Sequence, residues 1–231
     1  MRELNSMSGF DFTVRSFEDL TDAVERFGIV PLFKNSIPGF SVEEHVVPEV
    51  WFSDSEGVWE WKGPVIRQTG CAYGKLFEKK AAFVSAELYR ELANCRRDGY
   101  DFDARYEDGL AQRRDMELYD LVEKNAPVLS RSLKAMGDYR KGGRTCFDTS
   151  MNRLQEQCYI IISDFVYSRD RYGTAYGWGV AEYTTPEKFL GKDFTDHVYD
   201  RSPSESRGLI LDQLHALLPS AEESVLERFL K

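Results

Sequence analysis

The first clear pattern in the chain is an amphipathic stretch near its N-terminus. FEDLTDAVERF carries apolar residues at helical spacing. They are Phe17, Leu20, Val24 and Phe27. Ser16 is a favoured N-cap residue, and Gly28 is suited to the left-handed position that often ends a helix. The pattern therefore predicts a helix over residues 17–27.

Prolines and tryptophans dominate the next passage. Pro31, Pro38 and Pro48 lack a backbone donor, which predicts a loop with short ordered pieces over residues 29–50. Three of the four tryptophans follow in WFSDSEGVWEWKGPVIRQTG, to which the pattern assigns no element. The segments CAYGKLF and AAFVS then predict a β-hairpin, and Ser85 is placed to cap a helix in AELYRELANCRR.

The second half of the chain has a more regular pattern. Helices are predicted over residues 110–124, from Pro127 to residue 136, and over residues 146–158. Two strands follow at 159–167 and 176–183, with Gly173 in the turn between them. Short helices are expected after Thr185, after Ser202 or Ser204, and after Ser220.

The order of helix, helix, turn, helix, strand, wing-like turn and strand is that of a winged helix. The sequence thus predicts an α+β protein of tandem winged-helix-like units with β-hairpins and C-terminal helices. The expected divisions are an aromatic-rich, winged-helix-like unit at 1–108, a winged-helix domain at 109–200, and a helical segment at 201–231 that packs on the rest. No internal repeat at a fixed period is visible.

Composition narrows the class of protein. The chain has 231 residues, of which 42% are hydrophobic and 30% charged, as in globular proteins. It carries no apolar run of about 20 residues and no N-terminal apolar signal, so no membrane partner and a cytoplasmic location are expected. Four scattered cysteines and three histidines make a zinc site improbable and favour free buried thiols. No metal and no cofactor are expected.

A nucleic-acid-binding face is predicted on the third helix of the second half. Its polar flank includes Asn152, Arg153, Gln155 and Glu156, and Asn, Arg and Gln are the side chains that pair with base edges. Basic residues in the preceding turn and near the wing are candidates for phosphate contacts. They are Arg140, Lys141, Arg144, Arg169 and Arg171.

The charge balance leaves this function open. The net charge of −9 repels a polyanion over most of the surface, so contact with nucleic acid must be local. Residues 138–171 hold six basic and five acidic side chains, a net charge of +1. Winged helices also serve as protein-interaction modules, so a protein partner is the alternative. Residues 67–97 reach +4, although their lysines and aromatics also fit the solvated edge and the core face of a hairpin.

Two groups of residues are candidates for a pocket. Trp59, Glu60 and Trp61 place a carboxylate between two indoles, which suits a planar base, although tryptophans also fill cores. Asp101 and Asp103 lie in a carboxylate-rich segment whose arginines also favour a structural ion-pair network. The sequence contains no GxSxG, P-loop or dinucleotide-binding motif.

Several phrases together resemble the AlkZ-related family of bacterial proteins. They are WEWKGPVIRQTGCAYGKLFEKKAAFVS, NCRRDGYDFDARYEDG, NRLQEQCYIIISDF and YGWGVAEYTTPE, within residues 50–206. The namesake of the family is a winged-helix DNA glycosylase that excises alkylated purines and opens interstrand crosslinks. The resemblance implies tandem winged helices and a role on DNA, with divergent glycosylase-like base excision as its enzymatic form.

The resemblance also supplies catalytic candidates. The glycosylases use Gln-apolar-Gln or Gln-apolar-Asp to orient water at the glycosidic bond, and this chain has Gln155 and Gln157 with the charged Glu156 between them. The alternative is a non-enzymatic protein-interaction or small-ligand-binding protein that keeps the fold. The oligomeric state, substrate and partner are not determined by the sequence.

Overall fold

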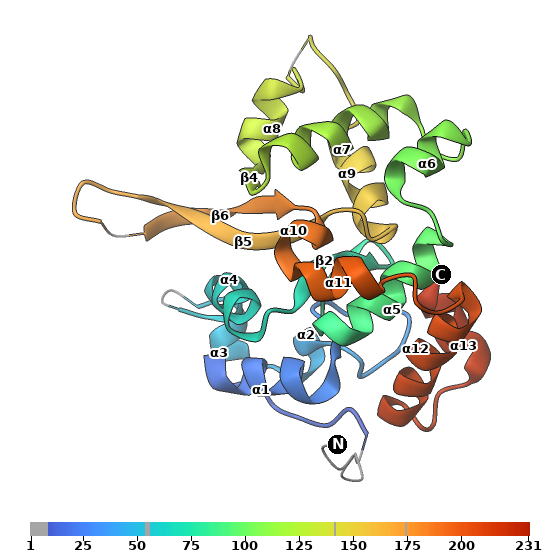
Figure 1. Cartoon of the computed structure of the whole chain (residues 1–231). Coiled ribbons are helices and arrows are strands. Elements are labelled where there is room, and N and C mark those ends of the chain that lie inside the picture. The colour runs from blue at the N-terminus through green and yellow to red at the C-terminus, as the bar shows by residue number, and fades with distance from the viewer. Residues whose placement is uncertain (1–8, 54–55, 141, 174) are drawn as a thin grey trace.

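Two small antiparallel sheets organise the molecule (Figure 1). The structure is a computed structural model that describes residues 9–53, 56–140, 142–173 and 175–231. The first sheet has the strand order β1-β3-β2 and the second has the order β4-β6-β5. Helices surround both sheets, so the predicted α+β class is confirmed.

The first sheet and its helices occupy the chain up to residue 84. The elements are α1 (Phe17–Phe27), β1 (Ile29–Pro31), α2 (Val42–His45), α3 (Pro48–Trp51), α4 (Val58–Thr69), β2 (Ala72–Phe77) and β3 (Lys80–Val84). The helix predicted over 17–27 is confirmed, because Ser16 Oγ accepts a hydrogen bond from Asp19 N and Gly28 ends the helix at φ 71°. The β2–β3 hairpin is confirmed as well.

Helix α4 contains Pro64 and lies in a stretch to which the sequence pattern assigned no element. Glu60 stabilises its first turn, since the carboxylate accepts a hydrogen bond from Gly57 N at 3.1 Å. Gly63 lets the helix approach β5 (Ile161–Arg169), because a Cβ at this position would collide with Asp164 Oδ1. Local signals for a helix breaker are therefore outweighed by packing between distant segments.

The second sheet belongs to the middle of the chain. Its elements and the preceding helices are α5 (Ala86–Arg97), α6 (Phe102–Glu107), α7 (Arg113–Asn125), β4 (Val128–Leu129), α8 (Ser130–Met136), α9 (Phe147–Glu156), β5, and β6 (Ala175–Thr184). The helix predicted from Pro127 begins only at Ser130, because Val128 and Leu129 pair with β6. The other predicted helices and strands of this part are present with ends shifted by at most three residues.

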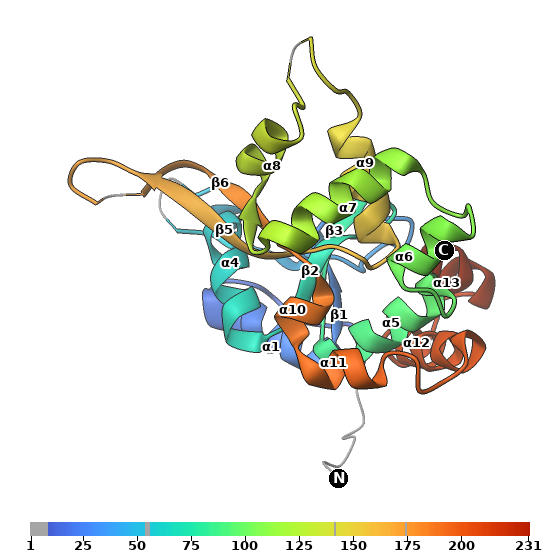
Figure 2. The same ribbon diagram turned by 45° about the horizontal axis from the view of Figure 1, so that its top comes forward.

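The helices and strands that build the two sheets follow the same order along the chain. In each, a helix leads to a short strand, further helices, and two longer strands, and the last strand lies between the other two. The same topology thus occurs twice although the sequence shows no repeat. In Figures 1 and 2 the β5–β6 hairpin extends well beyond the helices on one side.

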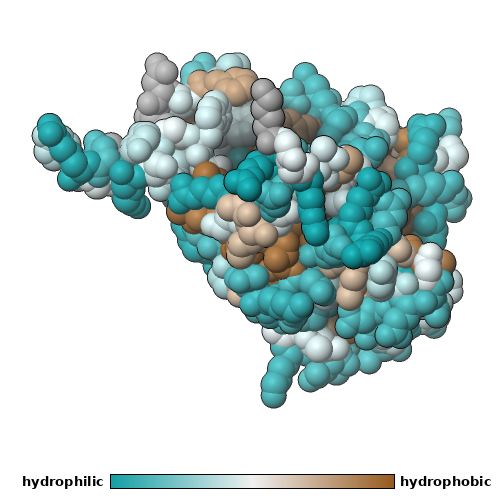
Figure 3. Space-filling model, turned by 90° about the horizontal axis from the view of Figure 1, so that it is seen from above, coloured by the Kyte–Doolittle hydropathy of each residue, from teal (hydrophilic) through white to brown (hydrophobic). Residues whose placement is uncertain are grey.

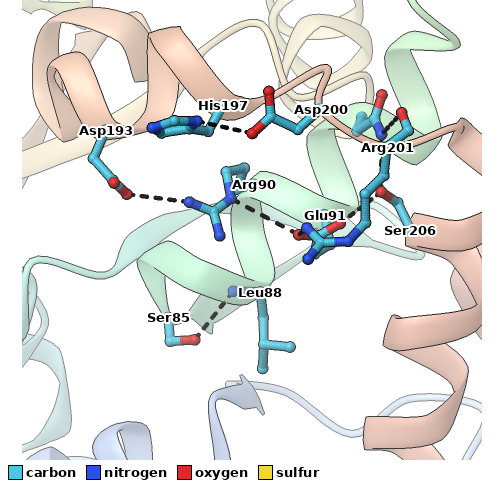
Figure 4. Close-up of polar contacts among 10 residues, drawn as sticks. Ser85, Leu88, Arg90, Glu91, Asp193, His197, Asp200, Arg201 and Ser206 are labelled. Atoms are coloured by element: carbon cyan, nitrogen blue, oxygen red, sulfur yellow. Dashed lines mark hydrogen bonds and ion pairs between the residues drawn. The ribbon is translucent and has the colours of Figure 1, made fainter.

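The C-terminal helices pack back on the first half of the chain. They are α10 (Pro186–Leu190), α11 (Lys192–His197), α12 (Pro203–Leu217) and α13 (Glu223–Leu230). Figure 4 shows how the buried Glu91 of α5 fixes them: it accepts hydrogen bonds from Ser206 at 2.6 Å and from Arg201 at 2.8 Å. Arg90 reaches Asp193 of α11 at 3.2 Å. A polar network therefore joins α5 to α11 and α12.

The hydrophobic interior forms two clusters. The first combines the β1-β3-β2 sheet with α1, α4, α5, α12 and α13. The second lies between α6, α7, α8 and α9, where Phe102 packs with residues such as Leu118 and Met151. The start of β5 is shared, since Ile160 belongs to the second cluster and Ile161 to the first. No helix among the described residues is both long enough and apolar enough to cross a bilayer.

Candidate nucleic-acid interface

Helix α9 buries its apolar side and presents part of its polar flank to solvent. Met151 and Leu154 pack into the second hydrophobic cluster, and Asn152, Arg153 and Glu156 are partly exposed. Gln155 was expected on the outer flank, but it is only 1% exposed. The helix packs against β2 of the first sheet as well as α7, and this second contact covers Gln155.

The described arginines around α9 form ion pairs with carboxylates. Arg153 pairs with the buried Asp115 of α7. Arg144 pairs with Glu117 at 2.7 Å, and Arg140 pairs with Asp138 at 2.6 Å. Lys141 lies outside the described residues. Two of the predicted phosphate contacts, Arg140 and Arg144, and the predicted base contact Arg153 thus have their charge compensated within the chain.

The two arginines of the β5–β6 hairpin differ from those around α9. Arg169 and Arg171 are exposed, and no carboxylate of the described residues lies within ion-pair distance of either. Arg169 donates to Gly173 O at 2.8 Å, and the Arg171 guanidinium lies over the Tyr172 ring, 4.6 Å from its centroid. In Figure 3 the projecting tip of the hairpin is hydrophilic. The uncompensated positive charge of this region therefore lies on the hairpin.

An aromatic cluster lies where the hairpin meets α3 and α4. It consists of Phe33, Trp51, Phe52, Trp59 and Trp178, whose neighbouring ring centroids are 5.7–6.0 Å apart. The predicted pocket of Trp59, Glu60 and Trp61 is divided in the fold. Trp59 belongs to the aromatic cluster, Glu60 caps α4, and Trp61 is buried in the first hydrophobic cluster.

Lys62 is a residue of this region that sequence reasoning missed. Its side chain is buried, at 8% exposure, and its Nζ lies 4.5 Å from the Trp59 ring centroid and 4.1 Å from that of Phe165. Burial lowers the pKa of the ammonium to about 8, and the nearby Glu60 opposes this shift. The spacing of Trp59 and Lys62 would have indicated the contact only if α4 had been predicted.

Asp101 and Asp103 line a separate cavity of about 510 Å³ between α5, α6, α7 and α11. The other lining residues are Arg97, Tyr119, Asp120, Glu123, Glu187, Thr195, Val198 and Tyr199. Arg97 is buried and pairs with Glu187 at 2.7 Å. Within the described ranges, no three His, Cys, Asp or Glu side chains form a group that could hold a metal ion. The cavity is thus acidic and contains an ion pair between the buried Arg97 and the partly exposed Glu187.

The sequence matches a protein-family model described as AlkZ related over residues 14–231, which is nearly the whole chain. The chain belongs to the AlkZ-related family. No curated protein and no solved structure matches it.

The two candidate catalytic glutamines of this AlkZ-related protein lie in different surroundings. Gln155 Oε1 accepts a hydrogen bond from Lys75 N at 3.0 Å, and Nε2 donates to Met151 O at 3.2 Å. Gln157 follows the end of α9 and is partly exposed. The amide of Gln155 therefore joins α9 to β2 and is covered, whereas Gln157 lies closer to solvent. Their role in orienting a water molecule stays a prediction.

We expect Gln155→Ala to lower the free energy of unfolding by about 1–3 kcal/mol, because it leaves the partly buried Lys75 N–H without an acceptor. Gln157→Ala is the matched control and should stay within about 0.5 kcal/mol of wild type. Urea unfolding followed by circular dichroism measures both. A Gln155→Ala protein as stable as wild type would show that the amide has no structural role.

Proposed function

We propose that this AlkZ-related protein is a tandem winged-helix protein that binds DNA through the β5–β6 hairpin. The repeated topology supports the architecture, because helix, strand, helix, helix, strand, wing and strand is the order of a winged helix. In such a motif the helix at the position of α9 faces the major groove, and the wing lies beside it. The resemblance to a family named after a DNA glycosylase supports DNA as the ligand.

The observation that carries the proposal is the contrast between the arginines. Those around α9 are held by Asp115, Glu117 and Asp138, whereas Arg169 and Arg171 are exposed without such partners. Affinity for DNA comes largely from cations that replace counterions at phosphates. In a chain of net charge −9, DNA that contacts cations projecting away from the body meets the least repulsion from the protein's own carboxylates.

Helix α9 has a secondary role in this proposal. Arg153 can contact a base only by leaving Asp115, which would then be buried without its partner. Asn152 carries no such constraint, since it is partly exposed on the outer flank. We therefore assign affinity to the hairpin and assign positioning on the duplex to α9.

We favour a function in which the protein binds DNA and Gln155 does not excise a base. A residue that orients a water molecule at a glycosidic bond must reach the substrate, and the Gln155 amide is covered and hydrogen-bonded at both ends. Release of a base from an alkylated duplex tests the enzymatic alternative. Release that Gln157→Ala abolishes without loss of stability would assign catalysis to Gln157.

The binding test measures the dissociation constant for a labelled duplex by fluorescence anisotropy between about 50 and 200 mM salt. We expect the double substitution Arg169→Gln, Arg171→Gln to weaken binding about tenfold or more and to reduce the slope of log Kd against log salt by about 2, one for each lost phosphate contact.

The matched control removes the same charge elsewhere. Arg15 and Arg26 are exposed at the two ends of α1, away from the hairpin. Arg15→Gln, Arg26→Gln should bind like wild type. The absence of binding at low salt, or equal effects of the two double substitutions, would overturn the proposal.

A further inference from the structure

The hairpin contains a second unusual feature, a bulge centred on Trp178. Between the pairs Val166–Val180 and Ser168–Tyr176, β5 advances two residues and β6 advances four. The two additional residues fall in the segment Gly177-Trp178-Gly179. Gly177 has φ 75°, a left-handed value that favours glycine. A Cβ at Gly179 would collide with the Tyr167 ring. The glycines thus permit a bulge, a device that redirects a side chain.

The bulge presents Trp178 to solvent beside a second exposed ring. Trp178 is 74% exposed and Phe52 is 70% exposed. Both contact Trp59, at centroid distances of 5.9 Å, with Phe52 stacked and Trp178 edge-on. Large aromatic side chains are usually buried, so two exposed rings that share Trp59 as a neighbour form a surface suited to a planar ligand.

The inner side of the aromatic cluster is polar and positively charged. The Lys62 ammonium lies against Trp59 and Phe165, with no carboxylate of the described residues within ion-pair distance. The indole Nε1 of Trp59 is buried and has no acceptor in the described part of the chain. Both groups are buried, so a ligand at the surface meets the exposed rings of Phe52 and Trp178. A nucleobase is a flat ligand that can stack on such a ring.

We propose that the exposed rings of Phe52 and Trp178 in the aromatic cluster hold an unpaired nucleobase that stacks on one ring and meets the other edge-on, so that the substrate class is duplex DNA with an extrahelical or single-stranded base. The inference rests on the proposed function, because it places the base beside the same hairpin. Arg169 pairs with Ala175 across the hairpin, three residues before Trp178. Three strand residues span roughly 10 Å, about three base-pair steps, so phosphate and base contacts fit one ligand.

Base stacking on aromatic side chains is sequence-tolerant and needs a base whose face is free. A fully paired duplex offers no such face except at its ends. The aromatic cluster therefore adds preference for unpaired bases to the general affinity that the arginines supply. Tyr172 is also exposed, at 75%, but its ring contact is with Arg171 and not with the cluster, which makes it a matched control on the same hairpin.

The experiment compares three labelled probes by anisotropy at one salt concentration: a blunt hairpin duplex, the same duplex with one bulged thymidine, and a single-stranded oligothymidine. We expect wild type to bind the bulged duplex about tenfold more tightly than the paired one. Trp178→Ala and Phe52→Ala should lose this preference and keep the affinity and salt dependence for the paired duplex. Trp178→Phe should keep most of the preference, and so should Tyr172→Ala.

The outcomes separate the two proposals. Salt-dependent binding of the paired duplex without preference for the bulge overturns the stacking site and leaves the proposed function standing. No binding to any probe overturns both. Loss of preference in Tyr172→Ala but not in Trp178→Ala rejects the aromatic cluster as the site. Conversion of a dimer to a monomer by Trp178→Ala, with unchanged binding of every probe, shows that the cluster is a protein contact and overturns the inference.

Discussion

Replacing Arg97 with methionine is expected to lower the free energy of unfolding by about 3 kcal/mol or more. The Arg97 guanidinium is buried and joins three parts of the chain. It donates to Cys158 O, at 2.7 Å from one terminal nitrogen, and to Glu187 at 2.7 Å. It also lies over the rings of Tyr159 and Phe194, at 4.7 and 5.3 Å from their centroids.

The expected loss of stability comes from the polar groups that lose a hydrogen-bond or charged partner when Arg97 is replaced. Methionine fills part of the volume but donates no hydrogen bond. Cys158 O would keep Tyr89 as a donor, at 3.1 Å, while Glu187 would lose its charged partner. Oε2 of Glu187 is already buried without a hydrogen-bond partner among the described residues, so the carboxylate would be left poorly solvated.

Urea unfolding followed by near- and far-UV circular dichroism measures this effect. Arg113→Met is the control, because Arg113 forms an exposed pair with Glu117 at 3.0 Å and its side chain is 83% exposed. Its loss should cost less than about 1 kcal/mol. If Arg97→Met is destabilised no more than Arg113→Met, the buried pair does not hold α5 to α10.

The second large effect concerns Lys62 and pH. We expect Lys62→Met to be more stable than wild type at pH 7, and we expect the difference to narrow by about 2 kcal/mol by pH 9.5. Methionine has a similar length and packs well against aromatic rings, so it should fit between Trp59 and Phe165.

The direction in which the stability difference changes with pH follows from the lowered pKa of Lys62. Lys62 has a pKa of about 8 in the folded chain and 10.5 as the ordinary value. Below pH 8 the ammonium is charged in both states, and its burial destabilises the folded state in full. Between pH 8 and 10.5 the unfolded chain binds the additional proton, so wild-type stability rises relative to the variant.

Urea midpoints of both proteins at pH 7, 8.5 and 9.5 provide the measurement. The comparison with Lys62→Met cancels the titration of the tyrosines, which both proteins share. A control substitution at the exposed Lys79, Lys79→Met, should show a difference from wild type that does not change with pH over this range. A constant difference for Lys62→Met would mean that its ammonium is well solvated.

Features that arise from neighbouring residues were predictable from the sequence alone. Ser16 and Gly28 fixed the ends of α1, and Ser85 fixed the start of α5, because capping depends on groups within one turn. The two hairpins and most of the later helices followed from residue type and periodicity. The family resemblance rested on short phrases, and the family was confirmed.

Which polar residues are available to a ligand depended on the three-dimensional packing of the chain. Periodicity places Gln155 on a polar flank, but the approach of β2, from 80 residues earlier in the chain, covers it. The arginines near α9 look alike in the sequence, yet Asp115 and Glu117 of another helix compensate two of them. Trp59 and Trp178 meet only because β6 pairs with β5 and β5 packs on α4. Local chemistry sets the elements, whereas burial and ion pairing arise from contacts between segments far apart in the chain, and the sequence pattern does not encode which segments those will be.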